Sequence, residues 1–205
     1  MTQTTPAFYF VGNHAILDFI NTRVPVNGQL VDLIAHFPAL LEWLRLSGLL
    51  SQELATQLDN QWGNSEAANE ITATAIELRN LLFDSVQQRI ASGSVPDRCV
   101  NLINSLLQDQ RITTKLFMKN QQYFSEKVVH MNEPLQILTP IAEAAVDFFC
   151  HYSPDFVKKC DNPECVLYFY DHSKNNTRRW CSQKTCGNRM KVRAYLERRR
   201  NNKNN

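Results

Sequence analysis

Two pairs of cysteines near the C-terminus constrain this chain more than any other feature. Cys160 and Cys165 enclose four residues, as do Cys181 and Cys186, and fifteen residues separate the two pairs. Two short knuckles at this separation can bring four thiolates to the corners of a tetrahedron, the geometry that Zn²⁺ takes in a closed structural site. The spacing therefore predicts one structural Zn²⁺ ion held by Cys160, Cys165, Cys181 and Cys186.

Other interpretations of the cysteines fit the sequence less well. Disulfides are unfavourable because the chain begins without the basic start and cleavage site of an export signal, and cytosolic thiols stay reduced. Unrelated cysteines would not be expected to form two equally spaced pairs. His172 is a further candidate ligand, but it lies in a turn far from the knuckles, where a histidine is more often solvated. Cys99 and Cys150 lie in apolar helical stretches, so we expect both in the core.

The residues between the two pairs suggest a hairpin. Val166–Tyr170 is aromatic and β-branched, which is typical of a strand. The segment 171–176 is rich in turn-forming residues, and 177–180 could return antiparallel to the first strand. Such a hairpin would deliver the second cysteine pair beside the first.

A basic helix is expected to follow the last cysteine. Gly187 would leave room close to the metal, Asn188 is a candidate N-cap, and Arg189–Arg200 is a good helical stretch. At about 100° per residue, Arg189, Arg193 and Arg200 share one face of this helix. The candidate nucleic-acid contacts on the helix and the preceding turn are Lys174, Arg178, Arg179, Arg189, Lys191, Arg193, Arg198, Arg199 and Arg200.

The motifs around the cysteines resemble a known family. Arg179-Trp180-Cys181 followed by Cys186-Gly187-Asn188-Arg189 resembles the signature of the bacterial CGNR zinc-finger proteins, and Asp171 and Arg178 also match its pattern. That family carries an N-terminal helical domain, called ABATE, that opens with a segment similar to Leu17-Asp18-Phe19-Ile20-Asn21-Thr22. The resemblance covers essentially the whole chain. It implies a stress-related transcription regulator that binds nucleic acid through the zinc module.

The charge distribution agrees with a basic C-terminal domain. The 205 residues carry a net charge of +2, but residues 156–205 hold 13 Lys and Arg against 4 Asp and Glu. The rest of the chain therefore has a net charge of −7. Part of the basic excess would compensate the formal −2 charge of a zinc ion with four thiolates. The remaining excess still favours an anionic partner such as nucleic acid.

Residues 1–155 are expected to be mainly helical. Apolar residues recur at helical spacing over 37–49, from Ser51, over 65–91, from Pro96 to Leu107, and over 134–152. Residues 23–28 are expected to form a loop, and 111–131 a β-hairpin. Ser153-Pro154-Asp155 is a natural hinge. We therefore predict a mainly α fold with two domains: a helical body (residues 1–152) that contains a small β-hairpin, and a C-terminal module (residues 156–205) of the treble-clef or ribbon type, with a knuckle, a hairpin and a helix.

The polar residues Asp18, Asn21 and Thr22 stand beside apolar Leu17 and Phe19. They could line a pocket for a small-molecule effector of unknown identity. Alternatively, they form a hydrogen-bond network that pins the N-terminal segment to the core.

Several classes of function are disfavoured. The apolar runs are too short for a membrane span, so we expect a cytoplasmic protein without a membrane partner. Four cysteines leave no open zinc position for water, and a phosphate-binding loop or nucleophile motif is not recognisable, so we do not expect an enzyme.

Two hypotheses remain for the function. The first is a transcription regulator that contacts double-stranded DNA through the C-terminal module. The second is an RNA-binding or protein-docking module. One small module rarely suffices for tight specific binding, so a homodimer is plausible.

Overall fold

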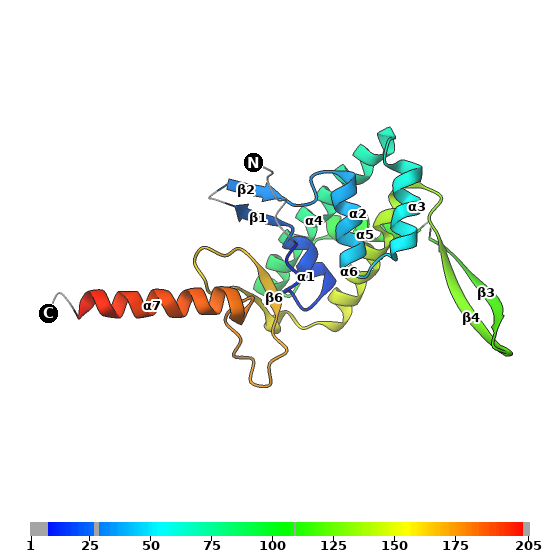
Figure 1. The fold of residues 1–205 in the computed structure, drawn as a ribbon. Helices are drawn as coiled ribbons and strands as arrows, with labels where there is room; N and C mark the ends of the chain where they lie inside the picture. Colours follow the sequence, from blue (N-terminus) through cyan, green and yellow to red (C-terminus); the bar gives the residue numbers. More distant parts are fainter. Residues whose placement is uncertain (1–7, 27–28, 109, 203–205) are drawn as a thin grey trace.

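The computed structural model describes residues 8–26, 29–108 and 110–202 (Figure 1). These residues form a mainly helical body, from which α7 and the β3–β4 hairpin project at opposite ends. Three antiparallel two-stranded sheets accompany the helices in the described part of the chain. The helices are α1 (Ala15–Ile20), α2 (Phe37–Leu46), α3 (Gln52–Trp62), α4 (Glu66–Ser92), α5 (Asp97–Gln108), α6 (Thr139–His151) and α7 (Asn188–Asn201); the strands are β1 (Arg23–Val26), β2 (Gln29–Asp32), β3 (Arg111–Lys119), β4 (Gln122–His130), β5 (Val157–Lys159) and β6 (Tyr168–Tyr170).

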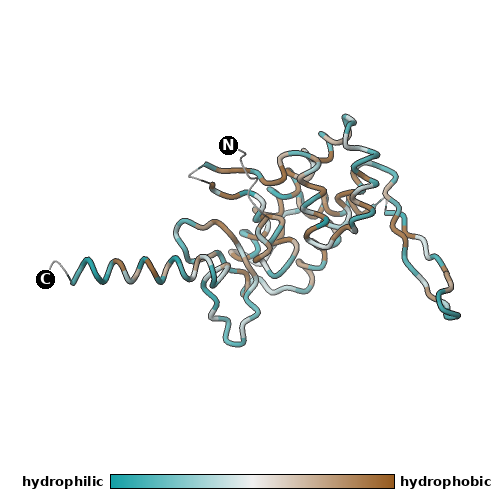
Figure 2. Tube along the Cα trace, in the orientation of Figure 1, coloured by the Kyte–Doolittle hydropathy of each residue, from teal (hydrophilic) through white to brown (hydrophobic). Residues whose placement is uncertain are grey.

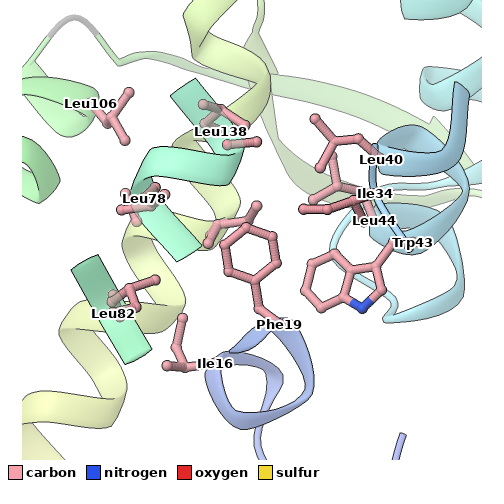
Figure 3. Packing of buried hydrophobic residues seen from close by; sticks show 14 of the residues in the cluster. Ile16, Phe19, Ile34, Leu40, Trp43, Leu44, Leu78, Leu82, Leu106 and Leu138 are labelled. Carbon is pink, nitrogen blue, oxygen red and sulfur yellow. The ribbon is translucent and has the colours of Figure 1, made fainter. Parts of the chain in front are cut away.

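Helix α4 is the central element of the body. Its apolar residues recur every three or four positions, so they form one buried stripe against which the other helices pack. Figure 3 shows Leu78 and Leu82 of α4 near Phe19 of α1 and Trp43 of α2. Trp43 and Phe19 are fully buried, with ring centroids 4.9 Å apart. The hydrophobic colouring in Figure 2 accordingly concentrates inside the body.

A buried ion pair ties α4 to the N-terminal segment. The Arg79 side chain is only 2% exposed and binds Asp32 through two hydrogen bonds, of 2.6 and 2.7 Å. Arg79 also donates to the Thr22 hydroxyl at 3.3 Å. Although burial opposes ionisation of Asp32, the hydrogen bonds from Arg79 lower the pKa of that carboxyl. This ion pair therefore fixes the end of β2 and the start of β1 against the central helix.

The predicted helices of the body are confirmed. Ser51 caps α3 by accepting from the Leu54 backbone NH. Gly48 and Gly93 adopt a φ of +78° after α2 and α4, a left-handed conformation that favours glycine. The hairpin expected within 111–131 is also present, as β3 and β4.

Three details of the sequence prediction are wrong. Arg23–Val26, expected in a loop, forms β1 and pairs with β2, because Val24 turns inward to a buried cluster; positions 27 and 28 lie outside the described residues. Residues 177–180 do not pair with β6, whose partner is β5. Cys99 is buried as expected, but Cys150 is exposed.

No helix in the described ranges is both long and apolar enough to cross a membrane.

Replacing Arg79 with Met should lower the free energy of unfolding by about 3–5 kcal/mol, because the Asp32 carboxylate would lose its partner while remaining partly buried. Chemical denaturation measures this change. Arg98→Met is the matched control, since the Arg98–Glu77 ion pair is solvent-exposed and such pairs contribute at most about 1 kcal/mol. Equal effects of the two variants would contradict a structural role for the buried pair.

Candidate metal centre

The first cysteine pair is placed by a short antiparallel sheet. Strand β5 ends immediately before Cys160, and β6 begins shortly after Cys165. The loop between the strands is closed by two backbone hydrogen bonds, Cys160 N to Leu167 O at 2.9 Å and Cys165 N to Asn162 O at 2.8 Å. The knuckle is therefore the loop of a hairpin whose strands lie on either side of it.

The second pair is placed by a turn that leads into α7. Residues Gln183–Gly187 form one π-helical turn, and Cys186 lies at its end. One detail of the prediction is wrong here. Asn188 is not the N-cap but lies inside the helix, where its side chain donates to Lys184 O at 3.1 Å. A Cβ on Gly187 would meet the Gln183 side chain at 2.9 Å, so the glycine makes room for that side chain.

The four predicted ligands form one cluster. Their Sγ atoms all lie within 4.8 Å of one another. The distance from Cys181 Sγ is 3.8 Å to Cys165 Sγ and 3.7 Å to Cys186 Sγ. In a regular tetrahedron with metal–sulfur distances of about 2.3 Å, the sulfur atoms lie about 3.8 Å apart. The all-thiol donor set and its spacing thus fit a single tetrahedral ion of the Zn²⁺ type.

Neighbouring donors orient the sulfurs. Asn162, which is 2% exposed, donates its amide to Cys186 Sγ at 3.3 Å, and the Cys181 backbone NH points to Cys160 Sγ at 3.4 Å. Such hydrogen bonds stabilise thiolate charge. Asn162 was not singled out from the sequence; its position inside the first knuckle is the only signal that could have indicated it.

The thiols resist simultaneous ionisation in the absence of a cation. The hydrogen bond with Cys165 and burial raise the pKa of Cys181, and burial raises that of Cys160. The same hydrogen bond from Cys181 lowers the pKa of Cys165 to about 5. A divalent cation would remove this conflict because it stabilises all four thiolates together.

Arg178 holds the turn that follows β6. Its guanidinium lies 4.2 Å from the centre of the Phe169 ring and donates to the backbone oxygens of Val11, Trp180 and Cys181. Arg178 is partly buried, so the structure separates it from the exposed cations with which it was grouped.

Asp171 organises the same turn from the other side. It accepts hydrogen bonds from Lys158 Nζ at 2.7 Å, Ser173 N at 2.9 Å and Arg178 N at 3.0 Å. Although burial opposes ionisation, these bonds lower the pKa of Asp171. Asp171 and Arg178, both part of the matched motif, are therefore structural residues of the module.

The segment Gly12–Asn21 attaches the module to the body. The Asn21 side chain donates to Tyr168 O at 2.8 Å and accepts from Tyr168 N at 2.9 Å, as a neighbouring strand would. Two positions further along β6, Tyr170 N donates to Gly12 O at 2.8 Å, and Asn13 donates to Tyr170 O at 2.9 Å. The outer edge of β6 is therefore completed by the N-terminal segment.

Asp18 and Thr22 support this attachment from inside the body. Asp18 accepts from Gly12 N at 2.7 Å, and burial raises its pKa to about 6. Thr22 donates to Phe19 O at 2.7 Å. A Cβ on Gly12 would lie 2.7 Å from the Leu17 Cβ, so only glycine permits this close approach. These contacts correspond to the hydrogen-bond network that was the alternative to an effector pocket.

The remaining predicted cations lie on the surface. Arg179 is 65% exposed and pairs with Asp161 at 2.7 Å, whereas Arg193 pairs with Glu197 at 3.1 Å. His172 packs against Tyr170, with ring centroids 4.7 Å apart, and does not belong to the cysteine cluster formed by the described residues. The exposed members of the predicted set are Lys174, Arg179, Arg189, Lys191, Arg193, Arg198, Arg199 and Arg200.

Comparison with family sequence models assigns both parts of the chain. The ABATE model, described as "Putative stress-induced transcription regulator", matches residues 13–152. The chain belongs to the ABATE family. The model of the CGNR zinc finger matches residues 157–199, which include all four cysteines, so a zinc-finger sequence follows the ABATE region. The description of the family is that of a regulator and not of an enzyme. No curated protein matches the sequence.

Replacing Cys181 with Ser should abolish binding of the single metal ion, because three thiols would remain at a site shaped for four. Elemental analysis of the purified protein measures the metal per chain. Cys150→Ser removes an exposed cysteine outside the cluster and should leave the metal content unchanged. A Cys181→Ser variant that kept one ion per chain would contradict the four-cysteine site.

Replacing Asn21 with Ala should loosen the module from the body, because two backbone groups of Tyr168 would lose their partners. Each unsatisfied buried group costs about 1–3 kcal/mol. Hydrogen exchange measured by mass spectrometry should show lost protection in residues 166–170. Asn80→Ala, a substitution on the surface of α4, is the control. Unchanged protection of 166–170 in Asn21→Ala would contradict the attachment.

Proposed function

We propose that this ABATE protein is a zinc-containing transcription regulator that contacts double-stranded DNA through its C-terminal module, residues 156–205. In this proposal the four cysteines hold one structural Zn²⁺ ion, and residues 1–152 form the body that carries the module.

The basic composition and the exposure of helix α7 are the main support for the proposal. Its 14 residues include six Lys and Arg and a single Glu, and none of the 14 is buried. The helix extends away from the body (Figure 1). A helix without a packed face needs a partner to become stable, and isolated helices of this length are marginal in water. A polyanionic duplex would supply that partner, since the major groove admits an α-helix.

The metal would fix the direction of α7. Cys186 lies in the turn directly before the helix, so a bound ion would hold the first turn against the cluster and leave the remaining turns free. The helix would then reach the DNA as a rigid element, with little loss of conformational entropy on binding.

The exposed cations have complementary roles in the proposal. Arg193 and Arg200 lie on one face of α7 and would bind phosphates, and Lys174 in the turn after β6 would add a contact from the same module. Arg178, whose donors are engaged within the protein, would act only by shaping that turn. The proposed contact residues are Lys174, Arg179, Arg189, Lys191, Arg193, Arg198, Arg199 and Arg200.

An apolar stripe on the same helix favours a second candidate function. Val192, Tyr195 and Leu196 are 57%, 54% and 49% exposed and lie at spacings of three and four residues. Such a stripe is typical of helices that dock into a groove of a protein. RNA binding by the same cations is the corresponding nucleic-acid alternative. We favour DNA because the cations outnumber the apolar residues and the family is described as a transcription regulator.

Titration of labelled duplex DNA at several salt concentrations tests the function directly. With about six phosphate contacts, the affinity should fall by about a thousandfold between 50 and 200 mM salt. The double variant Arg193→Ala/Arg200→Ala should bind more weakly at every salt concentration and should lower the slope of log affinity against log salt by about 2, with the metal content unchanged.

Arg45→Ala/Arg98→Ala is the matched control, because it removes the same charge from helical positions of the body, partly exposed at Arg45 and exposed at Arg98. This variant should bind like the unmodified protein. An affinity that did not respond to salt would contradict phosphate binding and favour protein docking, and tighter binding of competitor single-stranded RNA than of duplex DNA would favour the RNA alternative.

A further inference from the structure

The β3–β4 hairpin forms an arm that stands apart from the body (Figure 1). Each strand has nine residues, which corresponds to a length of about 30 Å. Asn120 and Gln121 form the turn at its tip with φ values of 52° and 63°, the left-handed pair of a tight hairpin turn. Nearly every residue of the arm is exposed.

The two faces of the arm differ in character. The strand register places one set of apolar residues on the same face, and these are strongly exposed: Leu116, Met118 and Tyr123 are 70%, 63% and 73% accessible. The opposite face carries the stacked pair Phe117 and Phe124 among polar and charged residues. We call the first of these the apolar arm face; its apolar members are Ile112, Leu116, Met118, Tyr123 and Val129, and it also contains Thr114, Ser125 and Lys127.

A two-stranded hairpin in water is marginally stable when neither face is covered. The exposure of the apolar arm face therefore indicates that a partner covers it. An apolar face of this kind on a free edge would also promote aggregation.

The apolar arm face continues into a groove at the root of the arm. Val129, at the end of this face, lines a groove of about 470 Å³ together with Leu49, Leu54, Met131 and Ala144. Apolar residues therefore recur along this face from the tip of the arm to the surface of the body, with Thr114, Ser125 and Lys127 between them.

The arm and the groove at its root carry opposite charges. The arm has four cations, Arg111, Lys115, Lys119 and Lys127, against one anion, Glu126. Two carboxylates, Glu143 and Asp147, line the root groove. A basic arm and an acidic root groove are complementary when two identical arms run in opposite directions, since Lys119, beside the tip of each arm, then comes near the root groove of the other.

We propose that the apolar arm face is the dimerisation surface of this protein. Two copies pack these faces together across a two-fold axis at the middle of the arms, and each tip lies over the root groove of the other copy. The contact is isologous, which means that both copies use the same surface. Assembly therefore stops at two subunits, and the apolar arm face of each copy is covered. Because α7 projects from the opposite end of the body, both helices remain free in the dimer.

Sedimentation equilibrium of the full metal-loaded chain, without nucleic acid, tests the proposal. The unmodified protein should be a dimer at micromolar concentration. Leu116→Glu places a charge at the centre of the contact and should raise the dissociation constant by at least about 30-fold, the effect of losing a well-buried interface anchor. Leu116 is largely exposed in one chain, so circular dichroism and the melting temperature of the monomer should be unchanged.

Gln122→Glu is the matched control, because it adds the same charge near the tip on the opposite face, across from Lys119. This variant should remain dimeric.

A monomeric unmodified protein, or a dimer that persists in Leu116→Glu, would overturn the proposal. It would likewise be overturned if Leu116→Glu weakened DNA binding without changing the molecular mass, since the arm would then be a nucleic-acid contact. Failure of the DNA titration leaves the measured mass unaffected, so the two proposals fail separately.

Discussion

The convergence of four sulfur atoms within 4.8 Å is the constraint on which the C-terminal module depends. The module has few buried apolar residues of its own, and three of the five that it contributes to its main cluster are Cys160, Cys181 and Cys186. Small units of this kind usually need a metal or disulfides to fold. The ionised thiols also repel one another. A bound cation would both remove that repulsion and join the two cysteine pairs, which are fifteen residues apart in the chain. A bound ion would thereby fix the direction of helix α7.

The module and the body are linked by more than the chain. Val24 and Leu33 of the body complete the cluster around the cysteines, and Asn21 hydrogen-bonds the edge of β6. The segment from Leu17 to Thr22 therefore serves as an attachment between the two parts. Through Thr22 this attachment reaches the buried Arg79–Asp32 pair and the central helix.

The sequence predicts the cluster of four cysteines and the body helices well because both depend on local spacing. Cysteine separation and helical periodicity are visible within a short window. What it could not predict are contacts between distant residues. Strand β6 pairs with β5 and not with 177–180, and Arg178, which belongs to a basic run, is directed inward by Phe169 and backbone oxygens. Arg79, hidden in an amphipathic helix, gives no local sign that it pairs with Asp32.

X-ray absorption spectroscopy at the zinc edge of the purified protein tests the central claim most directly. The four-thiolate centre predicts about four sulfur neighbours at about 2.3 Å and no nitrogen or oxygen ligand. A spectrum that requires nitrogen or oxygen in the first coordination sphere, or a protein purified with intact thiols that binds no zinc, would contradict it.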